Sequence, residues 1–260
     1  MKAAYIKQYG DVENLIVGDL PKPSISAYQV LIKVKAAGVN PVDFHIRNGM
    51  LEDSGTHELP LVLGWDAAGI VSEVGQHVTD FKLGDEVYVY SPLTEQGAHA
   101  EYLAVDANFV AHKPASLSFI QSAAVPLAAL TALQALTTHG ELQKGQQVLI
   151  HNASGGVGSF AVQIAKHMGA YVIATGSLAK KDFIMGLGAD EFIDYKQDDF
   201  EQHVSNIDLV FVAVGGNNIV ERSLVVIKPN GRLISLLGLR DKSTLFPTTS
   251  PKLSPPKTYR

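Results

Sequence analysis

Gln147-Val-Leu-Ile-His-Asn-Ala-Ser-Gly-Gly-Val-Gly158 is the stretch of the chain that decides the fold. Residues 147–151 have the apolar, β-branched composition of a buried parallel strand, and residues 153–158 read as a glycine-rich turn. Apolar residues then recur at helical spacing from Phe160 to Met168, and Gly169 closes the helix. The stretch therefore predicts a strand, a tight turn and a helix in succession.

The small residues of the turn have separate tasks. A phosphate-binding turn needs one where the chain bends most sharply, one where the backbone approaches a pyrophosphate, and one where the helix packs close to the strand. Gly155 and Gly158 occupy the second and third places, and Ala153 stands in the first. The N–H groups at the helix start would then face an anion. The stretch predicts a dinucleotide-binding site.

Strands and helices alternate beyond this stretch. The predicted strands are Tyr171–Ala174, Glu191–Ile193, Leu209–Val214 and Leu233–Leu236, with helices ending near Leu187 and Val226 and a short one near Phe200. Regular alternation predicts a parallel sheet with helices on both faces, a Rossmann-type doubly wound domain. Ahead of it, Ser118 and Gln121 form a capping box for a helix that Pro126 should break in two, the second part ending near Gly140. We expect this domain to span residues 118–243.

Residues 1–117 are rich in short strands. Lys2–Ile6 and Asn14–Val17 predict a hairpin, Val30–Ala36 alternates apolar and polar residues, and further strands follow near residues 69–74, 86–90 and 101–105. Many short strands separated by glycine turns predict a partly open β-barrel. The chain is therefore expected to be an α/β protein of two domains.

One short helix interrupts the strand-rich region. Asn40 suits the N-cap, Pro41 the first helical position and Asp43 the first turn, and Gly49 should end the helix. Asp43 and Arg47 are four residues apart, so they are expected to be able to pair. On these patterns alone, capping and surface pairing account for all three polar residues.

The composition excludes several classes of protein. The net charge is −5 and no Lys/Arg cluster lies along a predicted face, so we expect no nucleic-acid partner. The chain has no cysteine, which excludes disulfides, thiolate catalysis and cysteine-based zinc or iron–sulfur sites. The first strand begins close to Met1, with no room for a signal peptide, and the longest apolar run, Ala123–Leu136, is too short to span a bilayer. We expect a cytosolic protein with no membrane partner.

Six segments in a fixed order carry a family resemblance. They are Gly38–Asp43, Leu63–Gly69, Gly84–Val87, Gly97–Tyr102, Ala129–Ala132 and Ala153–Gly158. Over about residues 1–238 the chain resembles the zinc-independent branch of the medium-chain dehydrogenase/reductase superfamily, the quinone oxidoreductase-like enzymes. The resemblance implies a GroES-like substrate domain over residues 1–117 and a Rossmann NADPH-binding domain over residues 118–243. It also implies hydride transfer to a quinone or an α,β-unsaturated carbonyl.

The zinc ligands of related enzymes are replaced here. Zinc-dependent members of the superfamily carry a catalytic cysteine where this chain has Asn40, and Gly-His-Glu where it has Gly64-Trp65-Asp66. No two of the nine histidines have helical i, i+4 spacing, although His99 falls on a strand beside the expected cleft. We therefore expect no metal. Reduction of an activated double bond or a quinone suits such a site, since the developing oxyanion needs only hydrogen-bond donors and a proton.

The end of the second strand of the nucleotide domain indicates the cofactor. NAD-specific sites place an acidic residue there to bind a ribose hydroxyl, and Val172–Ser177 contains none. By resemblance, Ser177, Lys181 and Tyr195 match the residues that hold the 2′-phosphate in NADPH-dependent members. Taken singly, Ser177 also suits a helix cap and Lys181 a solvated helix face. Together with the missing acid they favour NADPH.

The resemblance also assigns the remaining site residues. Asn40 and Thr131 should lie beside the nicotinamide, and Asp43 belongs to the same candidate catalytic group. His45 stands where the family often has tyrosine; it is either a proton donor, because histidine exchanges protons near neutral pH, or an exposed helix residue. The expected cofactor-binding set is Asn40, Thr131, Ala153, Ser154, Gly155, Gly156, Val157, Gly158, Ser177, Lys181, Tyr195, Val214, Gly215, Leu237 and Gly238.

Two alternative functions stay open, and the first of them rests on the C-terminal residues. Thr244–Arg260 are rich in proline and show neither helical nor strand period, so we expect an irregular tail in place of the family's C-terminal return. Without that return the sheet edge would be exposed, which favours pairing into a homodimer. One alternative function is therefore an NADPH-binding protein with little catalysis. A zinc alcohol dehydrogenase is the other, and the missing ligands argue against it.

Overall fold

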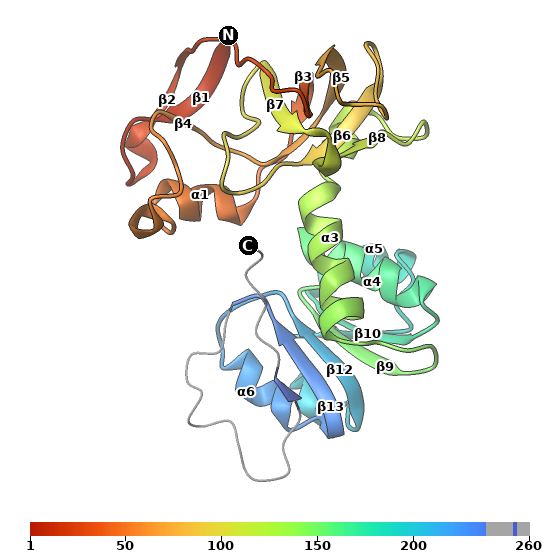
Figure 1. Ribbon diagram of the computed structural model, residues 1–260. Helices are drawn as coiled ribbons and strands as arrows, with labels where there is room; N and C mark the ends of the chain where they lie inside the picture. Colours follow the sequence, from red (N-terminus) through yellow and green to blue (C-terminus); the bar gives the residue numbers. More distant parts are fainter. Residues whose placement is uncertain (238–251, 254–260) are drawn as a thin grey trace. The chain divides into compact units, whose positions relative to one another are not determined.

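The computed structural model describes residues 1–237 and 252–253 of the 260-residue chain (Figure 1). The chain packs as two compact units, Met1–Leu127 and Ala128–Arg260. The sequence predicts the boundary at Ser118, before α2 (Phe119–Ala123). This helix packs on β3 (Gln29–Ala37) and β5 (Asp66–Val74) and so belongs with the first unit.

The first unit consists of two antiparallel sheets. A three-stranded sheet has the order β2-β1-β4, and a five-stranded sheet has the order β7-β3-β5-β6-β8. The curled five-stranded sheet matches the predicted partly open barrel, and β1 and β2 form the predicted hairpin. The remaining elements are β1 (Lys2–Ile6), β2 (Leu15–Asp19), α1 (Pro41–Arg47), β4 (Leu61–Val62), β6 (Glu86–Tyr90), β7 (Tyr102–Asp106), β8 (Val110–His112) and 3-10 turns at Val12–Asn14, Glu52–Ser54 and Ala107–Phe109.

Two apolar clusters form the main core of this unit. The first lies inside the curled sheet and includes Val30, Ile32 and Val87. The second surrounds Trp65, which is fully buried against Ile6 and other residues of the three-stranded sheet and of α1. The residue next to Trp65, Asp66, starts β5, so a carboxylate enters the protein interior at the edge of this second cluster.

The second unit is a six-stranded parallel sheet of order β11-β10-β9-β12-β13-β14 (Figure 1). Its elements are β9 (Gln147–His151), α4 (Gly156–His167), β10 (Tyr171–Gly176), α5 (Lys181–Gly186), β11 (Glu191–Asp194), β12 (Ile207–Val212), α6 (Ile219–Leu224), β13 (Ile227–Ser235) and β14 (Lys252–Leu253), with 3-10 turns at Leu178–Lys180 and Phe200–Gln202. The predicted strands and the predicted parallel sheet are confirmed. The predicted break at Pro126 is also confirmed, because α3 (Pro126–Gln134) starts there and a π-helical turn (Ala135–His139) follows it.

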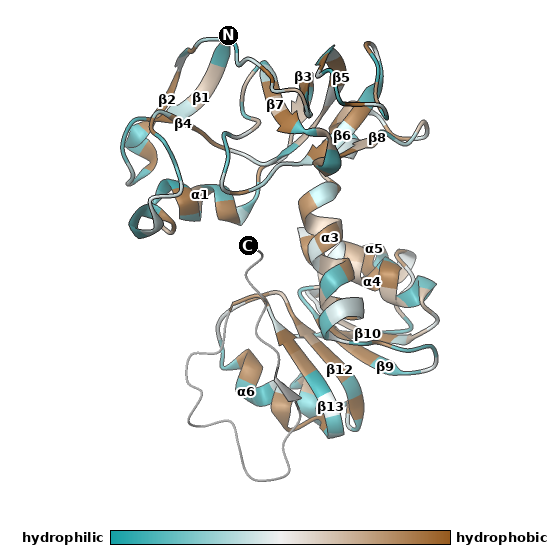
Figure 2. Cartoon of the chain, viewed as in Figure 1, coloured by the Kyte–Doolittle hydropathy of each residue, from teal (hydrophilic) through white to brown (hydrophobic). Residues whose placement is uncertain are grey.

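Helices cover both faces of this sheet. Val148 and Ile150 of β9 pack into a cluster with α4 and α5, whereas Leu149 between them belongs to a second cluster, against which α6 packs. Figure 2 shows the mainly apolar colour of the strands that carry these clusters. Burial on both faces is the reason that Val148, Leu149 and Ile150 of β9 form an uninterrupted apolar run, and it confirms the doubly wound arrangement.

The end of the chain differs from the predicted irregular tail at two residues. Lys252–Leu253 form β14, which pairs in parallel with Arg232–Leu233 of β13. A strand of two residues between prolines is too short to leave a periodic pattern, which is why sequence reasoning missed it. The rest of the predicted tail, residues 244–251 and 254–260, lies outside the described residues. Among those that are described, no helix is long and apolar enough to cross a membrane.

Candidate functional site

The turn after β9 has the geometry that its glycines predict. Asn152 adopts a left-handed conformation with φ of 57°, and its carbonyl accepts the N–H of Gly155 at 3.0 Å. A Cβ on Gly158 would lie 2.1 Å from the Asn152 carbonyl oxygen, so only glycine lets α4 pack this close to the strand. A Cβ on Gly156 would meet nothing within 4 Å. The turn is thus closed on the side of Gly158 and open on the side of Gly156.

The N-terminus of α4 carries unsatisfied donors. The N-cap is Gly155, which has no side chain, and no acceptor for the N–H groups of Gly156, Val157 or Gly158 is found in the described part of the chain. These groups and the helix dipole favour an anion at this end of the twelve-residue helix. The residues present therefore fit a dinucleotide pyrophosphate. Ala153, fully buried, and Ser154 precede them in the same turn.

The ends of β10 and β11 bring two of the residues expected at a 2′-phosphate, Ser177 and Tyr195, close together. Gly176 pairs with Asp194, and the N–H of Tyr195 reaches the Gly176 carbonyl at 3.2 Å, so Ser177 and Tyr195 follow neighbouring strand ends. Ser177 makes no side-chain capping bond although it precedes a 3-10 turn. Lys181 begins α5 and is exposed, and we find no ion pair to it among the described residues.

Asp194 is an acid at this edge that sequence reasoning did not consider. It is 7% exposed, and its carboxylate accepts the N–H of Lys196 at 3.1 Å in its own turn. An acid just after a strand of the nucleotide domain is the signal that would have drawn attention to it. Asp194 ends β11, and its carboxylate is bonded within its own turn. The end of β10 itself still presents no acid.

The remaining predicted residues of the second unit follow strand ends or lie on a helix. A Cβ on Gly215 would lie 3.2 Å from Leu237 Cδ1, so the segments after β12 and β13 lie together there. Val214 and Leu237 are 36% and 56% exposed, as befits residues that line an open site. Thr131 is half-buried on α3. Gly238 lies outside the described residues.

In the first unit, Asn40 is held by a buried acid. Asn40 is the N-cap of α1, as predicted, and its Nδ2 donates to Asp66 Oδ2 at 3.0 Å. The other oxygen of Asp66 accepts the N–H of Leu127 at 2.9 Å. Burial raises the pKa of Asp66 to about 6, although both hydrogen bonds favour the charged form. Sequence reasoning missed Asp66 as a functional residue; a charged residue directly before the apolar run of residues 67–71 was the available signal.

The predicted pairing of Asp43 with Arg47 is wrong. Arg47 turns back along the chain, where its Nη2 lies 3.6 Å from Asp11 Oδ1. Asp43 points inward and is 5% exposed. Its Oδ2 accepts the Asn40 N–H at 2.8 Å, its Oδ1 has no partner among the described residues, and burial raises its pKa. The i, i+4 rule describes solvated helix faces, and Asp43 is not on one.

The two histidines noted in this unit have different surroundings. His99 Nε2 lies 2.9 Å from the Gly38 carbonyl oxygen and 3.9 Å from Asp43 Oδ2. Its ring lies so close to Gly64 that a Cβ there would be 2.2 Å away. His45 is exposed, and its ring contacts that of Phe44 in a tilted arrangement, with centroids 4.2 Å apart. His99 is thus part of the Asn40–Asp43 group, and His45 lies at the surface.

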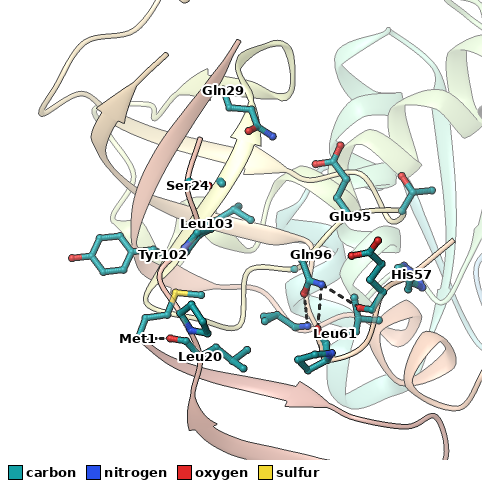
Figure 3. A pocket seen from close by; sticks show the side chains of 18 of the residues that line it. Met1, Leu20, Ser24, Gln29, His57, Leu61, Glu95, Gln96, Tyr102 and Leu103 are labelled. Carbon is teal, nitrogen blue, oxygen red and sulfur yellow. Dashed lines mark hydrogen bonds between the residues drawn. The ribbon is translucent and has the colours of Figure 1, made fainter. Parts of the chain in front are cut away.

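A separate cavity of about 590 Å³ lies in the first unit (Figure 3). Thr56 and His57 line it, but none of the predicted site residues does. Gln96 projects beside it and donates to the carbonyls of Glu58 and Pro60 at 3.3 and 3.2 Å. These bonds tie one loop to another, so we assign Gln96 a structural role.

Comparisons with known proteins identify the family. Residues 26–115 match the alcohol dehydrogenase GroES-like domain, and residues 156–252 match the zinc-binding dehydrogenase family. The 2-methylene-furan-3-one reductase of Solanum lycopersicum is 39% identical over 92% of this chain and 62% of its own length. The chloroplastic NADPH-dependent alkenal/one oxidoreductase of Arabidopsis thaliana is 39% identical over 92% of this chain and 63% of its own. The quinone oxidoreductase structure from Coxiella burnetii superposes with a TM-score of 0.82, at 37% identity over 90% of this chain and 75% of that one.

The chain belongs to the medium-chain dehydrogenase/reductase superfamily. This confirms the resemblance found in the sequence, and the GroES-like and Rossmann folds that it implied. The chain spans about three fifths of the length of the two curated relatives described above.

This member of the superfamily does not fit the metal for which its second matched family is named. The Asn40 amide is taken by Asp66, and Trp65 donates its Nε1–H to the Glu95 carbonyl at 3.2 Å from within the apolar core. Neither an amide nitrogen nor an indole is a zinc ligand, and the chain has no cysteine. In residues 1–237 no group of three or more His, Asp or Glu side chains is placed to hold a metal ion.

Proposed function

We propose that this chain is a zinc-independent oxidoreductase that transfers hydride to a quinone or an α,β-unsaturated carbonyl, with NADPH as the donor. The observation that carries the proposal is the N-terminus of α4. Its N–H groups have no acceptor among the described residues, and the space beside Gly156 is empty of protein atoms. They lie at the carboxyl ends of the parallel strands, as do Ser177 and Tyr195, and β10 ends there without an acid.

Different groups of residues would bind different parts of the cofactor. Gly155, Gly156, Val157 and Gly158 would hold the pyrophosphate, with Ala153 and Ser154 shaping the turn. Ser177, Lys181 and Tyr195 would hold the 2′-phosphate, and Lys181 supplies the positive charge. Val214, Gly215 and Leu237 would lie along the riboses, and Asn40 and Thr131 beside the nicotinamide. NADPH, when bound, supplies the hydride.

The chemistry of these side chains favours reduction over alcohol oxidation. Oxidising an alcohol needs a group that stabilises an alkoxide, and the positions that would hold a Lewis acid carry Asn40 and Trp65. A forming enolate or quinol oxygen needs only oriented hydrogen-bond donors, which amide and hydroxyl groups provide. Catalysis of this kind rests mainly on holding the two reactants in line. His45, at the surface of α1, is the candidate proton donor.

The names of the relatives support the substrate class. One relative is named a 2-methylene-furan-3-one reductase, another an alkenal/one oxidoreductase, and the structural neighbour a quinone oxidoreductase. All three names describe electrophilic carbonyl compounds. Location in the cytosol and a homodimeric state stay predictions, and one of these relatives is named as chloroplastic.

Steady-state oxidation of NADPH and NADH against a panel of quinones, enones and alcohols tests the proposal. We expect quinones or enones to be reduced with NADPH in preference to NADH, and alcohols to be inert. NADPH binding without turnover of any acceptor would instead favour the cofactor-binding protein without catalysis. Alcohol oxidation that depends on added zinc would contradict the proposal outright.

A further inference from the structure

The Asp66 carboxylate joins two segments that lie far from it in the sequence. Its Oδ2 accepts Asn40 Nδ2 at 3.0 Å and its Oδ1 accepts the Leu127 N–H at 2.9 Å. The first bond holds the N-cap of α1, and the second holds the first turn of α3. Asp66 is 1% exposed, so these two donors, rather than water, satisfy the carboxylate.

These two bonds have a fixed direction. The Leu127 N–H is a backbone donor and cannot become an acceptor, so the oxygen that faces it must accept. A carboxylate then presents an acceptor to Asn40 as well, and the Asn40 amide must turn its NH₂ toward Asp66. The carbonyl oxygen of that amide is consequently directed away from Asp66.

The surroundings leave Asp66 little room to move. A Cβ on Gly38 would lie 2.7 Å from the Ala123 carbonyl oxygen and 2.9 Å from Asp66 Cβ, so the chain before Asn40, the end of α2 and the acid are packed at contact distance. Asp43 does not replace Asp66, because its Oδ2 is already bonded to the Asn40 backbone N–H. One acid thus fixes the backbone of Asn40 and the other fixes its amide.

We propose that Asp66 is a positioning residue that fixes which way the side-chain amide of Asn40 is turned. This inference rests on the proposed function, which puts Asn40 beside the nicotinamide ring. An amide that is turned over presents a donor where an acceptor stood. Errors of orientation of this kind typically cost up to about 10²-fold in rate.

Asp66→Asn tests the inference because it replaces one acceptor oxygen by a donor NH₂ group and keeps the shape of the side chain. The new amide must turn its oxygen to the Leu127 N–H, so its NH₂ faces Asn40 and forces that amide to turn over. The double variant Asn40→Asp/Asp66→Asn restores a donor–acceptor pair at the same net charge. Asp85→Asn, which alters a half-buried acid that accepts the Lys82 N–H at 3.0 Å, is the control for loss of one charge in the same unit.

The first readout does not depend on turnover. In ¹⁵N-labelled full-length protein without cofactor, the Asn40 side-chain NH₂ signal is assigned by its loss in Asn40→Asp. We expect it to shift strongly in Asp66→Asn and to stay in place in Asp85→Asn. An Asn40 signal that is unchanged in Asp66→Asn would overturn the inference.

The second readout separates positioning from folding. Asp66→Asn should lower kcat by tenfold or more with a KM for NADPH within about threefold of the parent, and the double variant should recover at least part of kcat. If Asp66→Asn fails to fold, as judged by the fluorescence of Trp65, the double variant carries the test: folding with no recovery of kcat overturns the inference. If the wild-type protein oxidises no NADPH, the proposed function is contradicted instead. The NMR signal of the Asn40 side-chain NH₂ then decides the orientation of that amide.

Discussion

The imidazole of His151 and the hydroxyl of Ser223 lie 3.1 Å apart, although 72 residues separate them. The Ser223 hydroxyl donates to the Ile219 carbonyl at 2.6 Å, so it accepts from His151 Nε2–H. His151 Nδ1 then accepts from Thr175, 3.1 Å away. A neutral histidine thus joins β9, β10 and α6 immediately before the glycine turn.

His151 should make the second unit sensitive to acid. Burial lowers the pKa of His151 to about 4, so below pH 6.5 the unfolded chain binds a proton that the folded chain does not. Stability is therefore lost as pH falls from about 6.5 to about 4, by about 3 kcal/mol in total. Urea unfolding followed by circular dichroism at several pH values checks this against His151→Gln, which does not titrate. Parallel stability curves for the two proteins would contradict it.

Gly158 and Gly156 should respond differently to alanine. Gly158→Ala puts a Cβ 2.1 Å from a backbone oxygen, so we expect a loss of stability of several kcal/mol and loss of NADPH binding. Gly156→Ala meets no protein atom within 4 Å and adds helix propensity, so its melting temperature should be unchanged or higher while NADPH binds more weakly. Thermal melts with and without NADPH measure both. Equal melting temperatures for the two variants would show that the turn is not as described.

Lys181 should set the preference for NADPH. Lys181→Ala removes the charge expected at the 2′-phosphate, so the KM for NADPH should rise by about tenfold or more while that for NADH changes little. Lys144→Ala, at another exposed lysine of the same unit, is the matched control. Equal effects of Lys181→Ala on both cofactors would remove Lys181 from the phosphate site.

Asp66 should give the first unit the opposite pH dependence. Because burial raises its pKa to about 6, the folded chain holds a proton between about pH 4 and 6 that the unfolded chain has lost. Stability of this unit is therefore greatest below that range and falls by about 3 kcal/mol as pH rises through 6, with Asp43 acting in the same direction. The chain has one tryptophan, Trp65, whose fluorescence follows this unfolding. The trend should disappear in Asp66→Asn; if it persists unchanged there, another group causes it.

His45 is tested as the proton donor by His45→Phe. Loss of a general acid typically costs about 10²-fold or more, so turnover with an enone should fall by that order. Phenylalanine at this position keeps an aromatic ring beside Phe44. Because the position is exposed, the loss of folding stability should be small. Unchanged turnover from about pH 5 to 9 would assign the proton to solvent or to another side chain.

Local patterns predicted most of the architecture. The β9 strand, the glycine turn, the break at Pro126 and the capping box of Ser118 with Gln121 are all as expected, because each depends on residues within one turn or one strand. The capping role of Asn40 was predicted for the same reason. The glycine at 158 was predicted from the close packing of α4 on the strand before it, which is also a local contact.

Predictions about partners distant in sequence were weaker. Arg47 was expected beside Asp43 and lies near Asp11 instead, and Asp66 was seen only as a replaced metal position. β14 has two residues and exists through its pairing with β13, so its own residues carry no signal. In each case the partner comes from another element, and helical or strand period holds no information about it.

The sequence by itself determined the class of site: a glycine turn between a buried strand and a helix, no acid at the end of β10, and no cysteine for a metal. Only the tertiary structure decided which polar groups are buried and what they bond. Asp66 meets Leu127 across 61 residues, and His151 meets Ser223 across 72. A buried charge or imidazole is costly unless a donor or acceptor faces it, and the packing of separate elements supplies that partner.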